Sequence, residues 1–322
     1  MTRTLKLSSL KPYRLPQTNV LEQLPLRLLA AEGWRVAWNE PVSECDAWVV
    51  LDGLDSPDST LCPPENTLFV SAEPSAYKPY QGDWLKSFHR VVSVQARIVH
   101  PGLEHGHAPL PWFPKRSLDC LQLEAPQPKS APISTVCSSR HNMLGHRRRL
   151  RCLRALQRRL PGRIEWYGRK IRFIEDKWEG LAPFRFSLAI ENSREPHYWT
   201  EKISDCFLAR TVPLYDGAPN IGSYFPEGAY VPIDTDDPDS VVQTISDILE
   251  DPEALYQRML PAVEEARRRY LDQHSFGARL LGWCRAFQPG LNRRHVNLAP
   301  EPAPAWWPSK VIKFRRRWLG VT

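Results

Sequence analysis

Short apolar segments that alternate with helical patterns are the feature that most constrains this fold. Runs of strand-forming residues occur at 34–38, 47–51, 68–71, 91–94, 133–137, 164–167, 184–190, 212–215 and 230–233. Helical patterns lie at 19–32, 145–160, 199–209, from 237 onward and at 252–287. Apolar strands separated by helices are typical of parallel sheets that are covered on both faces. We therefore predict an α/β protein.

A proline-rich stretch divides this pattern into two halves. Residues 111–132 contain five prolines and show no sustained periodicity. At roughly 150 residues per domain, the 322 residues of the chain agree with two domains. We predict an N-terminal α/β domain over 1–115, a linker over 116–132, a second α/β domain over 133–290, and a Pro/Trp-rich basic tail over 291–322.

The net charge indicates the class of partner, and the cysteine pattern indicates the cellular compartment. Forty-three basic and 36 acidic residues give a net charge of +7, which favours an anionic partner: a nucleic acid, a phosphorylated small molecule or a membrane surface. The seven cysteines are scattered and form no C-x-x-C motif, which indicates free thiols rather than a disulfide or zinc framework. The N-terminus lacks the apolar block of a secretory signal. We expect a cytoplasmic protein.

Polar residues are densest just after the strand predicted at 184–190. This strand leads directly into Glu191 and Asn192, and Thr200 is the predicted N-cap of the next helix, with Lys202 in its first turn. Ligands of parallel sheets bind beyond the carboxyl ends of the strands, and free N–H groups at a helix N-terminus attract anions. The pattern indicates an anion site. An ordinary capped helix with a solvated lysine is the alternative interpretation.

The same region resembles a known family. The string E-N-S-x4-Y-W-T-E-K-I-x-D, followed by V-P-L-Y-x-G-A-P-N-I, is similar to the signature of α1,3-fucosyltransferases of glycosyltransferase family 10. The matching residues are Glu191, Asn192, Ser193, Tyr198, Thr200, Glu201, Lys202, Asp205, Val212, Pro213, Tyr215, Gly217, Pro219, Asn220, Tyr224 and Phe225. Upstream, 145–156 resembles a family helix with Arg149 in the arginine position, and Tyr167-Gly168 matches a further motif. The resemblance is strong over 133–237 and weak before it.

The resemblance implies a glycosyltransferase B-type fold with two Rossmann-like domains. It implies inverting transfer of fucose from GDP-fucose to a glycan hydroxyl, in surface polysaccharide or lipopolysaccharide synthesis. The C-terminal domain would hold the donor and the N-terminal domain the acceptor. Arg149 and Lys202 are carried over as the diphosphate contacts, and Asn192, Tyr198 and Glu201 as residues that line the nucleotide or the sugar.

The register of the arginine-rich helix leaves an alternative. Cys152 stands where the family helix has an aromatic residue. Arg147 and Arg148 therefore remain candidates beside Arg149, and the other arginines of this helix are expected to be solvated.

Inversion by direct displacement needs a base that accepts the proton of the acceptor hydroxyl. The resemblance implies a glutamate at a strand end in the acceptor domain, and Glu73, before Pro74, fits that description. A surface glutamate in a turn is the alternative reading. Asp83 and Glu104 are weaker candidates for the base.

Two patterns suggest a metal site, and neither is favoured. Asp234-Thr235-Asp236 has the D-x-D form, but Asp236 and Asp237 are explained as residues that cap the next helix. His105 and His107 lie in a Gly/Pro loop without a clear third ligand. We expect no metal site and no required cofactor. His141 and His197 lie beside the matched motifs as candidate ligand contacts only.

The tail interleaves aromatic and basic residues, which suits contact with an anionic membrane surface on the inner face. These residues are Trp306, Trp307, Lys310, Lys313, Phe314, Arg315, Arg316, Arg317 and Trp318. A disordered basic end is the alternative. Two other functions stay open: a transferase of the same fold that uses another nucleotide sugar, and a non-catalytic nucleic-acid-binding protein. We expect no nucleic-acid partner.

Overall fold

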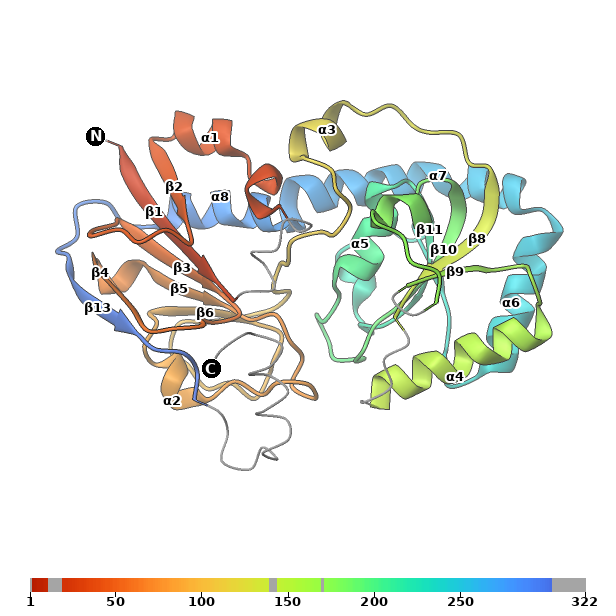
Figure 1. Ribbon diagram of the computed structural model, residues 1–322, viewed down its shortest axis with the longest axis horizontal. Coiled ribbons are helices and arrows are strands. Elements are labelled where there is room, and N and C mark those ends of the chain that lie inside the picture. Colours follow the sequence, from red (N-terminus) through yellow and green to blue (C-terminus); the bar gives the residue numbers. More distant parts are fainter. Residues whose placement is uncertain (1, 11–18, 139–143, 169–170, 303–322) are drawn as a thin grey trace. The chain divides into compact units, whose positions relative to one another are not determined.

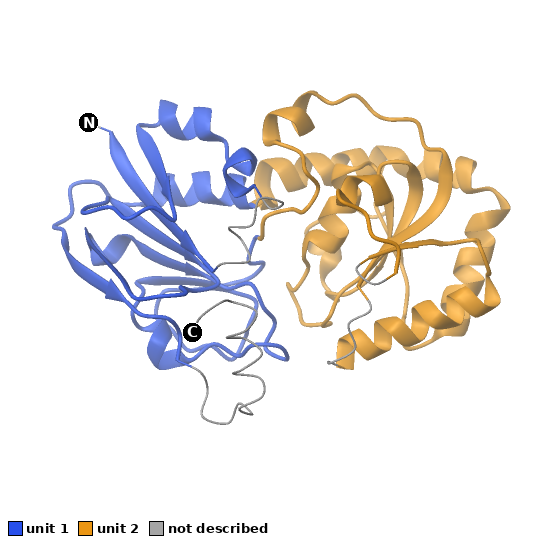
Figure 2. Ribbon diagram, in the orientation of Figure 1, with its two compact units in different colours: residues 1–109, 276–322 blue, residues 110–275 orange. Residues whose placement is uncertain are grey.

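The computed structural model describes residues 2–10, 19–138, 144–168 and 171–302 (Figure 1). The chain forms two compact units (Figure 2). Unit 1 comprises residues 1–109 and 276–322, and unit 2 comprises residues 110–275. The tail residues singled out above, from Trp306 onward, and His141 lie outside the described residues.

Unit 1 is built on a six-stranded sheet with the order β2-β1-β3-β5-β6-β7, in which all pairings are parallel. The strands are β1 (Arg3–Ser9), β2 (Trp34–Trp38), β3 (Ala47–Leu51), β5 (Thr67–Val70), β6 (Arg90–Ser93) and β7 (Leu103–His105). An antiparallel pair, β4 (Asp58–Cys62) and β13 (Arg294–Leu298), forms a second sheet. The helices are η2 (Val20–Gln23), α1 (Leu26–Ala31), η3 (Pro64–Asn66), α2 (Gly82–Leu85) and α8 (Phe276–Ala286).

The core of unit 1 surrounds its central strands. All five residues of β3 are buried, because β1 and β5 flank this strand and its side chains are covered on both faces. An aromatic cluster packs on β5, where the ring of Phe69 lies 5.0 Å from that of Trp84 and 5.3 Å from that of Phe88. These contacts hold α2 against the sheet close to the carboxyl end of β5.

Unit 2 contains a five-stranded parallel sheet with the order β12-β11-β10-β8-β9. The strands are β8 (Ala131–Val136), β9 (Glu165–Tyr167), β10 (Phe184–Ile190), β11 (Val212–Asp216) and β12 (Val231–Pro232). The helices are α3 (Leu118–Leu123), α4 (Leu144–Arg159), η4 (Lys177–Gly180), α5 (Glu201–Leu208), η5 (Ile221–Ser223), α6 (Pro238–Glu250), α7 (Pro252–Arg269) and the π-helix η6 (Tyr270–His274). The predicted fold class, α/β with two Rossmann-like parallel sheets, is confirmed.

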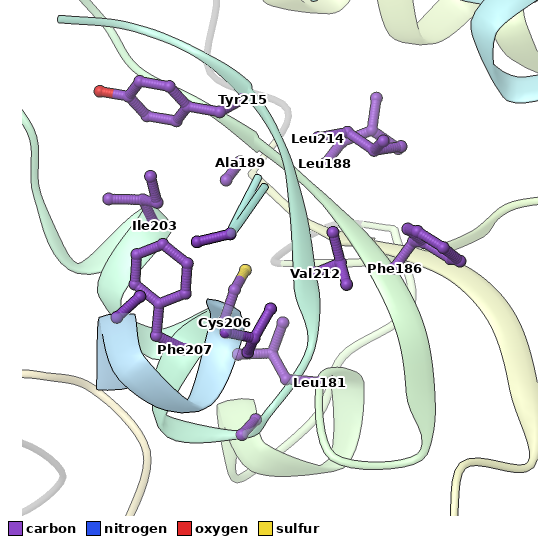
Figure 3. Packing of buried hydrophobic residues seen from close by; sticks show 14 of the residues in the cluster. Leu181, Phe186, Leu188, Ala189, Ile203, Cys206, Phe207, Val212, Leu214 and Tyr215 are labelled. Atoms are coloured by element: carbon purple, nitrogen blue, oxygen red, sulfur yellow. The ribbon is translucent and has the colours of Figure 1, made fainter. Parts of the chain in front are cut away.

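Both faces of the central strand β10 are buried. Successive side chains of a strand point to opposite faces, so Phe186 and Leu188 lie on one face and Ala189 on the other (Figure 3). Ile203 and Phe207 of α5 pack on the Ala189 face (Figure 3). This packing fixes the start of α5 beside the carboxyl end of β10.

The boundaries of the two units differ from those expected from sequence. Part of the expected linker, α3, buries Leu118 and Leu121 in the core of unit 2. Residues 276–290, expected in the second domain, belong to unit 1, because Gly277 of α8 packs directly on the backbone of Gln23. Strand β13 also belongs to unit 1, through its pairing with β4. Among the described residues, no helix has the length and apolar character that a membrane span requires.

The packing of β10 predicts a large stability difference between two phenylalanines of unit 2. Phe186→Ala removes a fully buried ring and is expected to lower the free energy of unfolding by about 3–5 kcal/mol. Phe173→Ala, at a side chain that is 75% exposed, is expected to change it by less than about 0.5 kcal/mol. Chemical denaturation followed by intrinsic fluorescence measures both. Equal effects of the two variants would contradict the assigned core.

Candidate functional site

A pocket lies in unit 2 where the carboxyl ends of β8 and β10 meet the first turn of α5. Its empty volume is ≈330 Å³, counted with the open space at its mouth. Among the described residues that line it, the charged side chains are three cations: Arg149, Lys177 and Lys202. The carboxyl edge of a parallel sheet is the usual position for a ligand.

Glu191 connects the end of β10 to the start of α5. The residue is fully buried, and its carboxylate accepts hydrogen bonds from the backbone N–H of Thr200 (2.8 Å), the Thr200 hydroxyl (2.9 Å) and Lys202 Nζ (3.0 Å). Thr200 is the N-cap of α5, as predicted, and its Oγ1 accepts from the N–H of Lys202. The carboxylate therefore fixes the helix terminus and the lysine together.

Lys202 is largely buried, so the alternative of a solvated lysine is wrong. Its Nζ lies 2.9 Å from Thr200 Oγ1 and 3.6 Å from a carboxylate oxygen of Glu201. Burial opposes the charged form of Lys202, but Glu191 and Glu201 outweigh it and raise its pKa. Burial likewise opposes the charged form of Glu201, but Lys202 and Lys177 lower its pKa. Both side chains are charged at neutral pH.

Arg149 projects from α4 into the pocket and is 5% exposed. Its Nη1 donates to Asn192 Oδ1 over 2.9 Å, while its buried Nε has no hydrogen-bond partner among the described residues. Helix α4 lies close to the backbone of Asn192 because residue 145 is a glycine. A Cβ at Gly145 would collide with the backbone carbonyl of Asn192. Arg149 is thus a buried cation that an amide, rather than a carboxylate, holds in place.

The two alternative arginines point elsewhere. Arg147 is exposed, whereas Arg148 reaches the backbone carbonyl of Glu191 (3.5 Å) and lies 3.9 Å from Asp216. Of these three arginines, only Arg149 is among the described residues that line the pocket.

Lys177 is a pocket residue that the sequence analysis missed. It begins η4, and its Nζ donates to Asp205 Oδ2 (2.7 Å) and to the backbone carbonyl of Glu201 (3.2 Å). Burial disfavours its charge, but Asp205 and Glu201 raise its pKa. The available signal was the capping box formed by Asp176 and Glu179, which predicts a helical turn and not the position of this ammonium group.

Asp205 matches the family signature and is fully buried below the pocket. One carboxylate oxygen of Asp205, Oδ2, pairs with Lys177. Burial raises the pKa of Asp205 to about 7, and the attraction of Lys177 only partly offsets this effect.

The remaining predicted donor residues, Asn192, Tyr198 and Glu201, are not among the described residues that line the pocket. Asn192 holds Arg149, and Glu201 lies beside Lys202. Tyr198 is buried in the loop that leads into α5. In the same loop His197 has a left-handed φ of 66°, and its N–H donates to Asn220 Oδ1 over 2.8 Å.

The D-x-D aspartates are engaged by arginines. Arg194 forms a bidentate pair with Asp216 at the end of β11 (2.6 and 2.7 Å) and also contacts Asp234 (2.6 Å) and Asp236 (3.0 Å). Arg151 pairs with Asp236 as well. Within the described ranges, no group of three or more His, Cys, Asp or Glu residues is placed to hold a metal ion.

The base candidates lie in unit 1. Glu73 follows the carboxyl end of β5 and is half-buried. Asp83 is exposed on α2 and pairs with Lys86. The carboxylate of Glu104, in β7, contacts two arginines, Arg90 and Arg279.

The histidines of the neighbouring loop bond to the protein backbone. His100 Nε2 and His105 Nε2 each lie 3.1 Å from a main-chain carbonyl oxygen. His105 is exposed, so this contact does not remove its side chain from solvent.

The fold is that of glycosyltransferases of the B type. A crystal structure of an α1,3-fucosyltransferase aligns with a TM-score of 0.54 at 16% identity, over 89% of this chain and 90% of that one. A second, with GDP-fucose, aligns at 0.52 and 15% identity over the same share of this chain. Anabaena Alr3699/HepE in complex with UDP-glucose aligns at 0.51 and 9% identity, over 88% of this chain and 99% of that one.

The sequence assigns the family. Residues 128–292, just over half of the chain, match the model for the C-terminal region of glycosyltransferase family 10 (fucosyltransferase), and the protein belongs to this family. It is 34% identical over 58 residues to the α-(1,3)-fucosyltransferase FucT of Helicobacter pylori, covering 18% of this chain and 12% of that protein. It is 45% identical over 51 residues to a putative fucosyltransferase-like protein of Arabidopsis thaliana, covering 16% and 10%. These alignments span only about a tenth of the relatives' length.

The buried carboxyl group of Asp205 predicts a pH dependence of stability. Its pKa of about 7 in the folded state lies above the ordinary 3.8, so between these values the folded state binds a proton that the unfolded state has lost. The free energy of unfolding therefore falls as pH rises through this window, by up to about 1.4 kcal/mol per unit, and is level above it.

Asp205→Asn is expected to remove this slope between pH 5 and 7. Asp247→Asn, at an exposed aspartate of the same unit, is the matched control and should keep it. Urea denaturation at half-unit pH intervals measures both variants. An unchanged slope in Asp205→Asn would show that this carboxyl group does not titrate there.

Proposed function

We propose that this protein transfers fucose from GDP-fucose to a hydroxyl group of a glycan, with inversion at the anomeric carbon. Family membership supports fucosyl transfer, and the aligned α1,3-fucosyltransferase structures include complexes with GDP and with GDP-fucose. We place the acceptor among surface polysaccharide or lipopolysaccharide precursors on the cytoplasmic side. The net positive charge of the chain supports activity close to an anionic surface.

The observation that carries the proposal is the uncompensated charge of Arg149. This guanidinium is buried and lines the pocket, and within the described part of the chain its partner is the neutral amide of Asn192. A buried charge without an opposite charge is costly, so the pocket favours an anionic ligand. The planar guanidinium suits a diphosphate, which it binds through two parallel hydrogen bonds.

The chemistry follows from the positions of the cations. As the bond between the sugar and the diphosphate breaks, negative charge grows on the leaving oxygen. Arg149 and Lys202 stabilise this charge without reorganising, because Asn192 and Glu191 already hold them. The positive end of α5 adds to the same field. Glu201, Asn192 and Tyr198 shape the donor side.

The acceptor step needs a base, and we assign it to Glu73. Its carboxylate accepts the proton of the acceptor hydroxyl while that oxygen attacks the anomeric carbon from the face opposite to GDP.

Other nucleotide sugars are the alternative donors, and a panel of GDP- and UDP-sugars offered with glycan acceptors tests them directly. Transfer from GDP-fucose is the expected result; transfer from a UDP-sugar alone would overturn the assigned donor.

Loss of the pocket arginine is expected to impair the reaction strongly. Arg149→Gln should lower kcat/KM for GDP-fucose by at least about 10- to 100-fold, because the loss of even one charge-assisted hydrogen bond has an effect of this size. Arg154→Gln, on the exposed face of the same helix, keeps the rate and is the matched control. Initial-rate measurements with radiolabelled donor give kcat/KM for both variants. Wild-type kcat/KM in Arg149→Gln would exclude this arginine from the donor site.

We further propose that protein cations replace a divalent metal in this reaction. The support is that Arg149, Lys177 and Lys202 line the pocket, and that arginines engage the D-x-D aspartates. Transfer rates are expected to be equal with excess EDTA and with added Mg²⁺ or Mn²⁺. A chelator-induced loss that Mn²⁺ restores would contradict this proposal.

A further inference from the structure

A buried polar network lies beneath the loop that carries Glu73. Its members are Asp52, Lys78, Tyr80 and Gln95, and each is more than nine-tenths buried. They gather at the carboxyl ends of β3 and β5. The proposed reaction assigns no role to any of them.

The hydroxyl of Tyr80 is the centre of this network. It donates to Asp52 Oδ1 over 2.6 Å and accepts from the backbone N–H groups of Ala72 (2.9 Å) and Glu73 (3.2 Å). A phenol hydroxyl has one donor and two acceptor positions, so these three bonds use its full capacity. Burial and the Asp52 carboxylate raise the pKa of Tyr80 well above its ordinary value, which keeps the hydroxyl protonated.

Gln95 holds the other side of the same residue. Its Nε2 donates to the backbone carbonyl of Glu73 over 2.9 Å and to that of Lys78 over 2.8 Å. Both main-chain polar groups of Glu73, the N–H and the C=O, are therefore bound by buried side chains. The side chain of Glu73 thus projects from a fixed backbone.

Asp52 is held in an unfavourable conformation to make these contacts. Its φ is 61°, in the left-handed region. Lys78 Nζ donates both to its backbone carbonyl and to its Oδ1, each over 2.9 Å, and lies 3.4 Å from Glu301. Backbone strain and buried ion pairs are costly, and such strain concentrates at functional sites.

We propose that Tyr80 and Gln95 are positioning residues that fix Glu73 as the base, and that the Asp52–Lys78 pair orients the Tyr80 hydroxyl. The inference rests on the proposed role of Glu73. A base acts only within hydrogen-bonding distance of its proton, and a displacement of about 1 Å lowers a rate by on the order of 100-fold. A backbone anchored at both polar groups prevents this displacement.

The test is Tyr80→Phe, which removes the hydroxyl and keeps the ring. We expect kcat to fall about 10- to 100-fold while KM for GDP-fucose is unchanged, because the donor residues lie in unit 2. Thr60→Val is the matched control: it removes another buried hydroxyl of unit 1, which donates to the backbone carbonyl of Val42 over 2.9 Å. Thr60→Val is expected to keep the wild-type kcat.

A double-mutant comparison separates positioning from general stabilisation. In a Glu73→Gln background, Tyr80→Phe should lower the residual rate no further, whereas a merely structural role would lower it by the same factor in both backgrounds. Where Tyr80→Phe does not fold, Gln95→Met removes the second anchor and serves in the same cycle.

The outcomes distinguish the two proposals. Full activity in Glu73→Gln would overturn Glu73 as the base, and the positioning role with it. Loss of activity in Glu73→Gln combined with wild-type kcat in Tyr80→Phe and Gln95→Met would overturn the positioning role alone.

Discussion

The buried carboxylate of Glu191 is the interaction on which the arrangement of the candidate site depends. It accepts hydrogen bonds from the backbone N–H of Thr200, the N-cap of α5, from the Thr200 hydroxyl and from Lys202. A carboxylate without these partners would be unstable at full burial, and its hydrogen bonds add to the packing of Ile203 and Phe207 that holds the start of α5 beside β10. Glu191 thus connects the end of β10, the N-terminus of α5 and the ammonium group of Lys202.

The remaining charges of the pocket follow from this anchor. Lys202 pairs with Glu191, and Lys177 pairs with Asp205. Arg149 is the pocket cation that an amide rather than a carboxylate binds, so the pocket carries a net attraction for an anion. Carboxylates hold the two lysines in place, and Arg149 supplies the positive charge that no carboxylate of the described residues neutralises. Under the proposed function, this division would let protein groups bind the diphosphate of the donor.

Local features of the site were predictable from sequence, and contacts between distant segments were not. The strand at 184–190 and the cap at Thr200 follow from an apolar run and from the preference of threonine for helix N-termini. The pairing of Lys177 with Asp205 joins positions 28 residues apart, and no periodicity encodes it. The crossing of α8 back to unit 1 was missed for the same reason, since its helical pattern continues that of α7.

Strand β1 was not predicted from the sequence, for a different reason. Its sequence contains Thr4, Lys6 and Ser8, which weakens the apolar signal, yet it lies inside the sheet of unit 1, between β2 and β3. Lys6 is buried because its Nζ pairs with Asp58 over 2.7 Å. This pairing lets Lys6 lie between Leu5 and Leu7, which are both fully buried in the core.

Calorimetric titration of GDP into the wild-type protein, with a chelator present and at two salt concentrations, tests the central claim most directly. The account predicts binding heat without any divalent ion and an affinity that weakens as salt increases, because cations of the protein hold the diphosphate. Folded protein that gives no heat with GDP, or binds it only after Mg²⁺ or Mn²⁺ is added, would contradict it.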